Sequence, residues 1–132
     1  MKTLTKSEML LMNILWGMQR GARVADIQKQ YPEPQPAYTT IATFLKILEQ
    51  KGFVEKRKSG VGKTFVYSPL MTQERYRRLV MDEVKQTFFD GSLTSLVSFF
   101  AKEEKLTDAD IREIVSIIEK NNHNQHLSTP NY

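Results

Sequence analysis

The chain contains no cysteine and only two histidines among its 132 residues. The absence of cysteine excludes disulfide bonds, thiolate catalysis and cysteine-ligated metal sites. Both histidines, His123 and His126, fall in a polar C-terminal segment, where their spacing would allow only weak metal binding. No ordered histidine is left for a Ser-His-Asp triad, and no glycine-rich loop has Walker or Rossmann spacing. We therefore expect no enzyme activity, no metal site and no cofactor.

Long apolar runs are also missing from the chain. No stretch approaches the roughly 18 apolar residues that a membrane span needs. The first residues, Met1–Lys6, lack the apolar core of a signal peptide. The composition, 40% hydrophobic and 26% charged, is that of a globular protein. We expect a cytoplasmic protein of one domain, or of one domain with a small appendage.

Positive charge is concentrated in the first half of the chain. Residues 1–70 hold 11 Lys and Arg against 5 Asp and Glu, whereas residues 71–132 hold 8 against 10. The N-terminal half therefore carries +6 and the C-terminal half −2, which together give the net charge of +4. This asymmetry favours a half that binds a polyanion joined to a half with another task, although ordinary surface charge is the simpler explanation.

Two short helices are predicted at the start of the chain. Thr5 and Glu8 form a capping-box pattern that begins a helix over Lys6–Met18, with an apolar stripe at helical spacing. A second helix is predicted over Val24–Gln30. Three prolines between residues 32 and 36 end it and form a rigid connector.

The third predicted helix, Ala37–Lys51, has two contrasting faces. At 100° per residue, Ile41, Leu45 and Leu48 fall on an apolar side with Phe44. The opposite side carries Thr39, Thr43, Lys46 and Gln50, with Ala42 at its edge. Threonine lowers helix propensity, so its repetition favours a functional reason over a plain solvated face. Short hydroxylated side chains let a helix approach base edges closely, which suits DNA reading.

A basic hairpin is predicted after this helix, over Phe53–Ser59 and Thr64–Pro69, with a glycine-containing tip. Residues 22–24 are predicted to form a short strand that pairs with it. Helix, basic hairpin and glycine-rich tip in this order are typical of a winged helix-turn-helix DNA-binding domain. We expect phosphate contacts from the hairpin and from the start of the third helix, by Tyr38, Arg57, Lys58 and Lys63. Protection of a sheet edge is the alternative reason for its basic residues.

Three further helices are predicted over residues 71–122, followed by a disordered polar tail at residues 123–132. Fifty residues of helix bury too little surface for a secure core, so their apolar stripes imply a partner, and an identical chain is the simplest one. We expect a mainly α protein: a winged-helix domain at residues 1–70 and a helical dimerisation domain at residues 71–122. The expected dimerisation residues are Leu79, Leu93, Leu96, Val97, Ile111, Ile114, Val115 and Ile118.

An ordered set of short motifs resembles the BlaI/MecI/CopY family of penicillinase and methicillin-resistance repressors. The motifs span nearly the whole chain and stand at residues 4–8, 14–16, 37–41, 48–54, 67–70, 89–92 and 106–107. The resemblance implies a homodimeric transcriptional repressor that binds an inverted-repeat operator. By the same resemblance, base contacts are expected from Thr39, Thr40, Ala42 and Thr43, with Lys46 added on the same side of the helix.

The resemblance also implies how repression is relieved. In the β-lactam branch, a membrane sensor metalloprotease system triggers cleavage of an Asn-Phe bond in the C-terminal domain. That bond aligns with Phe99-Phe100, where the asparagine is absent. The copper-responsive branch senses copper through cysteines, which this chain lacks.

Two other functions remain open from the sequence. A winged helix can serve protein–protein contact, although the basic hairpin argues against this use. A ligand-responsive regulator is the second alternative, although the C-terminal helices show no evident ligand pocket.

Overall fold

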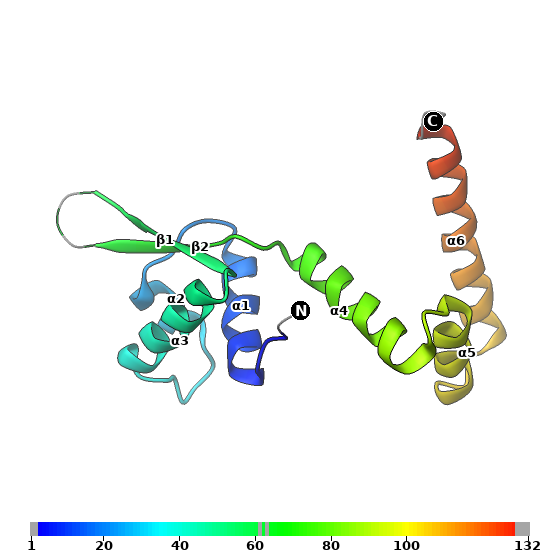
Figure 1. The fold of residues 1–132 in the computed structure, drawn as a ribbon, viewed down its shortest axis with the longest axis horizontal. Coiled ribbons are helices and arrows are strands. Elements are labelled where there is room, and N and C mark those ends of the chain that lie inside the picture. The colour runs from blue at the N-terminus through cyan, green and yellow to red at the C-terminus, as the bar shows by residue number, and fades with distance from the viewer. Residues whose placement is uncertain (1–2, 61, 63, 129–132) are drawn as a thin grey trace. The chain divides into compact units, whose positions relative to one another are not determined.

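The computed structural model describes residues 3–60, 62 and 64–128. This part of the chain is mainly α-helical with one antiparallel hairpin, as predicted (Figure 1). In chain order the elements are α1 (Lys6–Met18), α2 (Val24–Gln30), α3 (Tyr38–Gln50), β1 (Val54–Lys58), β2 (Phe65–Pro69), α4 (Gln73–Phe89), α5 (Leu93–Glu103) and α6 (Asp108–Ser128). None of these helices is both long and apolar enough to cross a membrane.

The first helix begins where the sequence predicted. The Thr5 hydroxyl accepts a hydrogen bond from the Glu8 N–H at 3.2 Å, and the Glu8 carboxylate accepts one from the Thr5 N–H at 2.8 Å. This reciprocal cap satisfies two amide groups that the helix itself cannot pair. The predicted bounds of α1 and of α2 are both confirmed.

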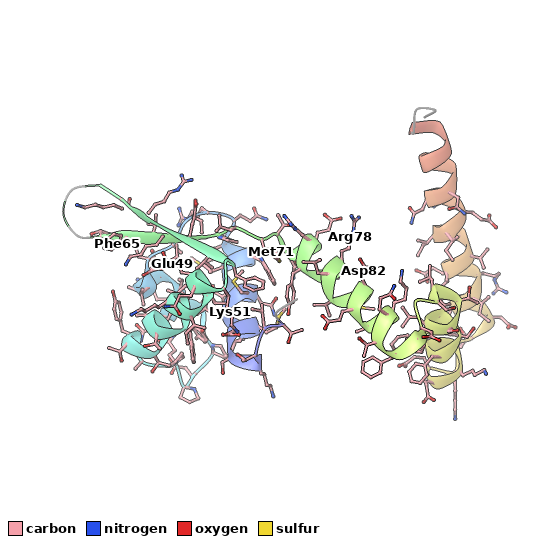
Figure 2. All side chains as sticks on the ribbon, viewed as in Figure 1. Glu49, Lys51, Phe65, Met71, Arg78 and Asp82 are labelled. Carbon is pink, nitrogen blue, oxygen red and sulfur yellow. The ribbon has the colours of Figure 1, made fainter. Side chains whose placement is uncertain are left out.

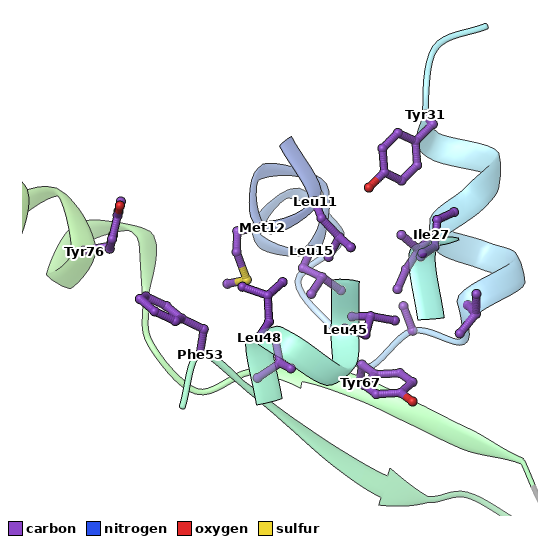
Figure 3. Close-up of a cluster of buried hydrophobic side chains, with 14 residues drawn as sticks. Leu11, Met12, Leu15, Ile27, Tyr31, Leu45, Leu48, Phe53, Tyr67 and Tyr76 are labelled. Carbon is purple, nitrogen blue, oxygen red and sulfur yellow. The ribbon is translucent and has the colours of Figure 1, made fainter. Parts of the chain in front are cut away.

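The core of the N-terminal part lies between α1, α2 and α3 (Figure 3). Its completely buried side chains come from all three helices: Leu11, Met12, Leu15, Ile27, Ile41, Leu45 and Leu48. The apolar side predicted for the third helix is therefore the buried one. Phe44, expected on that side, is only partly buried at its margin.

The hairpin β1–β2, which we call the wing, is attached to the helices at its base. Ala22 and Tyr67 exchange two backbone hydrogen bonds, of 3.0 and 2.8 Å. The predicted strand over residues 22–24 is thus a single bridge. Gly52, with a φ of +86°, turns the chain from α3 into β1, and that left-handed conformation favours glycine.

Two compact units make up the chain, and their boundary lies between Glu83 and Val84 inside α4. The boundary expected from the sequence, at residue 70, falls earlier. The difference arises because the start of α4 packs on the first unit. The Tyr76 ring lies 5.7 Å from that of Phe53 and 6.0 Å from that of Trp16, centroid to centroid.

Two hydrogen bonds reinforce the aromatic contacts of Tyr76 at the start of α4. The Tyr76 hydroxyl accepts from the Leu4 N–H at 3.0 Å, and the Trp16 indole N–H donates to the Met71 carbonyl at 2.9 Å. Tyr76 is 8% exposed. The first half of α4 is therefore structurally part of the N-terminal unit.

The second unit consists of the end of α4 together with α5 and α6. Phe89 and Phe99 pack with ring centroids 5.6 Å apart, and Leu96 is buried. Helix α6 continues to Ser128, beyond residue 122, where the last helix was expected to end. The reason is that neither glycine nor proline stands between Asp108 and Ser128.

A buried ion pair connects the start of α1 to the end of α3. The Lys51 ammonium lies 2.8 and 3.0 Å from the two carboxylate oxygens of Glu8, which is 4% exposed. Burial alone would raise the pKa of Glu8. The bonds from Lys51 and from the Thr5 N–H outweigh burial and hold that pKa below its ordinary value of 4.5.

We expect Lys51→Met to destabilise the fold by about 3 kcal/mol, because it leaves a buried carboxylate without its cation. The depressed pKa also sets a pH dependence. The ionised Glu8 carboxylate makes its full contribution to the free energy of unfolding when the pH is above the ordinary pKa of 4.5. That contribution is lost as the pH falls through the lower pKa of the folded state. Urea unfolding at pH 7 and at pH 3.5 measures both effects. The exposed Lys46→Met is the control, and equal losses in the two variants would contradict the role of the pair.

Candidate nucleic-acid interface

The outer face of α3, formed by Thr39, Thr43 and Lys46, is exposed along its length. No acidic residue stands in the first turn of the helix. The face is therefore made of short, uncharged side chains at its start and a cation further along. A surface of this kind can approach the edges of base pairs without electrostatic repulsion from phosphates.

One hydrogen bond fixes how Thr43 can act. Its hydroxyl donates to the Thr39 carbonyl at 2.9 Å, one turn back along the helix. The hydroxyl proton is thereby used, while the oxygen can still accept and the methyl group stays available. In this rotamer Thr43 can accept from a base amino group, or contact a thymine methyl.

The other two residues expected to read bases lie on the flanks of α3. Thr40 is exposed and lines a hollow with Leu10 and Pro36. Ala42 is half-buried and lies on the opposite flank, beside Phe65 of the wing. The predicted base-reading residues therefore occupy one broad arc of the helix, with Thr39, Thr43 and Lys46 at its centre and Thr40 and Ala42 at its two margins.

The wing has two chemically different faces. Directly paired residues share a face, so Lys56 opposite Tyr67 and Lys58 opposite Phe65 project to one side. We call this the inner face, because Phe65 and Tyr67 line a hollow together with Tyr38 of α3. Figure 2 shows Phe65 on this hairpin. The Lys56 ammonium lies 4.2 Å from the centroid of the Phe65 ring, a cation–π contact that orients it.

Arg57 projects from the other face of the wing. Its guanidinium Nε lies 2.7 Å from a carboxylate oxygen of Glu55, two residues back on the same strand. The sequence-based set of phosphate contacts included Arg57 and omitted Lys56. Alternation along the strand would have shown that Lys56 and Lys58 share a face and that Arg57 does not.

The remaining predicted phosphate contacts are Tyr38 and Lys63. Tyr38 begins α3 and is 53% exposed, beside the inner face of the wing. Lys63 lies outside the described residues. The arrangement that the structure describes is thus a small-residue helix face next to a basic hairpin, both fixed to one core. The described residues contain no group of three or more side chains suited to hold a metal ion.

The model of one protein family, described as penicillinase repressor, matches residues 4–120. The chain belongs to this family. Its members are repressors of transcription rather than enzymes, and the recognition made from sequence motifs is confirmed.

Individual relatives agree with the family. The penicillinase repressor of Bacillus licheniformis is 31% identical over 81 residues, which cover 61% of this chain and 62% of that protein. The methicillin resistance regulatory protein MecI of Staphylococcus aureus strain N315 is 25% identical over 117 residues, covering 89% and 94%. A penicillinase repressor of Staphylococcus aureus is 28% identical over 118 residues, covering 87% and 90%.

In the second unit, the side chains expected to dimerise differ in exposure. Leu96 is 8% exposed, so it packs inside the unit, and Leu79 of the first unit is half-buried. The other expected residues are between 39% and 61% exposed: Leu93, Val97, Ile111, Ile114, Val115 and Ile118. Ile117 of α6, which is not among the expected residues, is 52% exposed.

We expect Lys56→Gln to weaken DNA binding more than Arg57→Gln. Loss of one phosphate contact should reduce the slope of log K against log salt by about 0.9. Fluorescence anisotropy with a random-sequence duplex at several salt concentrations measures this slope. Arg57 serves as the matched control, since it adjoins Lys56 but lies on the other face. A larger effect from Arg57→Gln would reverse the assignment of the two faces.

Proposed function

We propose that this protein is a cytoplasmic, dimeric transcriptional repressor that binds an inverted-repeat DNA operator. The observation that carries the proposal is the pairing of the outer face of α3 with the basic inner face of the wing, on one core. In this proposal Thr39, Thr43 and Lys46 read bases, with Thr40 and Ala42 at the margins of the contact. Tyr38, Lys56, Lys58 and Lys63 contact phosphates.

The charge distribution supports a DNA partner over a protein partner. The basic excess lies in residues 1–70, and the only acidic side chain of β1, Glu55, is paired with Arg57. A winged helix used for protein contact has no need of this excess. Phosphate contacts position such a domain on DNA, and base contacts then supply the specificity.

The exposed side chains of α5 and α6 support dimerisation. Ile111, Ile114, Val115, Ile117 and Ile118 are each at least 39% exposed on one helix of the described chain. An apolar surface of this kind on a small unit is typical of an interface. A dimer would present two copies of α3 to two half-sites, which corresponds to an inverted repeat.

Relief of repression is proposed to occur by cleavage between Phe99 and Phe100, under a membrane sensor metalloprotease. The bond lies inside α5, and the two rings contact each other at a centroid distance of 5.4 Å. Because proteases bind extended substrates, α5 has to open locally before cleavage. A fragment ending at Phe99, detected by mass spectrometry in β-lactam-treated cells, would identify this bond.

Thr43 offers a test of base readout with two conservative variants. Thr43→Ala should weaken binding to a selected operator by roughly 1–3 kcal/mol and leave random DNA unaffected. Thr43→Val keeps the methyl group and removes the acceptor, whereas Thr43→Ser does the opposite. Gel shifts with DNA selected from a random library by the wild-type protein compare the three variants. If Thr43→Ala loses the same affinity for operator and for random DNA, Thr43 does not read bases. If the wild-type protein shows no salt-dependent binding to any DNA, the repressor function is refuted.

Assembly can be tested separately through Ile114. Ile114→Asp should give monomers with reduced operator affinity, because a carboxylate cannot be buried unpaired in an apolar interface. Light scattering measures the mass, and Glu113→Gln on the neighbouring exposed position is the control. Persistence of dimers in Ile114→Asp would place the interface elsewhere.

A further inference from the structure

A hollow of about 440 Å³ lies between α2, the start of α3 and strand β2. Its lining includes Arg23, which is the N-cap residue of α2, together with Asp26 and Lys29 of α2, Tyr38 of α3 and Phe65 of β2. Arg23, Asp26 and Lys29 were not among the residues predicted from the sequence to contact DNA. The hollow adjoins the outer face of α3, because Ala42 forms part of its wall.

The polar groups of this hollow are suited to phosphate. Arg23 and Lys29 supply two cations, and the hydroxyls of Tyr38 and Thr64 supply donors. Arg23 lies beside Asp26: its Nε is 3.5 Å from the Asp26 carboxylate, which also accepts from the Arg23 backbone N–H at 3.3 Å, and both side chains are exposed. The Nε contact uses one of the five guanidinium donors, so a fork remains for a phosphate.

The position of the hollow identifies which part of a DNA duplex would occupy it. A helix in the major groove has a sugar–phosphate backbone on each side. The hollow lies on the flank of α3 that faces the wing, as the shared lining by Ala42 and Phe65 shows. The base edges would lie against the outer face of α3, so the part of the duplex next to this flank would be the sugar–phosphate backbone.

We propose that the hollow seats the backbone of one DNA strand, with Arg23 and Lys29 as phosphate ligands that position α3 in the groove. This inference rests on the proposed DNA-binding function and adds α2 to the helix and wing as a third contact element. Asp26 has two effects: it orients Arg23, and its charge opposes a phosphate at the same place. The carboxylate therefore lowers the affinity for any DNA, which limits binding to non-operator sequence.

The test compares full-length variants on a random-sequence duplex and on DNA selected by the wild-type protein. Arg23→Gln and Lys29→Gln should each reduce the slope of log K against log salt by about 0.9. Each should also weaken binding to both duplexes by the same factor. Asp26→Asn keeps an acceptor for the Arg23 N–H and should tighten binding to random DNA several-fold. Arg77→Gln on α4 is the charge-matched control, and thermal unfolding checks that every variant is folded.

The rise in affinity of Asp26→Asn separates direct contact from structural damage, since a damaged α2 can only weaken binding. Wild-type slopes in both Arg23→Gln and Lys29→Gln would overturn the inference and leave the repressor function intact. Absence of wild-type binding to any duplex would instead refute the function itself. Calorimetry with inorganic phosphate tests for a free anion. If the wild type binds phosphate saturably, and Arg23→Gln abolishes this binding without changing DNA affinity, the hollow binds a free anion and the inference is overturned.

Discussion

Helix α3 can present a defined outer face only because its other face is completely buried. Ile41, Leu45 and Leu48 pack against the side chains of α1, so any rotation of α3 about its axis would expose apolar surface or open cavities. The Glu8–Lys51 ion pair adds a directional contact at the end of the helix. The orientation of Thr39 and Thr43 is thus a consequence of the core rather than of the surface.

The same constraint determines where the wing lies. Phe53, just before β1, and Tyr67, within β2, are both part of the core. The bridge between Ala22 and Tyr67 attaches the hairpin next to α2. The inner face of the wing is turned towards α3 because Tyr67 is buried there. Lys56 and Lys58 share that face with Tyr67 by strand alternation. A buried aromatic residue therefore orients the charged residues beside it.

Local sequence signals predicted most of the secondary structure correctly. The Thr5–Glu8 cap, the prolines after Tyr31 and the glycine after Lys51 each act within one turn of chain, so α1, α2 and α3 could be located from them. Contacts between distant residues left no such signal. The packing of Tyr76 on Trp16 and Phe53, which moves the unit boundary into α4, depends on side chains far apart in the sequence. So does the hollow beside α2, because its walls come from three elements.

The boundary inside α4 bears on how cleavage could end repression. The contacts that hold α3 and the wing all lie before Glu83, so the first unit does not need α5 or α6 to complete its core. A cut between Phe99 and Phe100 would leave that unit folded and its proposed DNA-contacting surface intact. Affinity would fall because the two DNA-binding units of the proposed dimer would no longer be joined, which removes the high effective concentration of the second unit at its half-site. Cleavage would then act on assembly alone, and the recognition surface would need no conformational change.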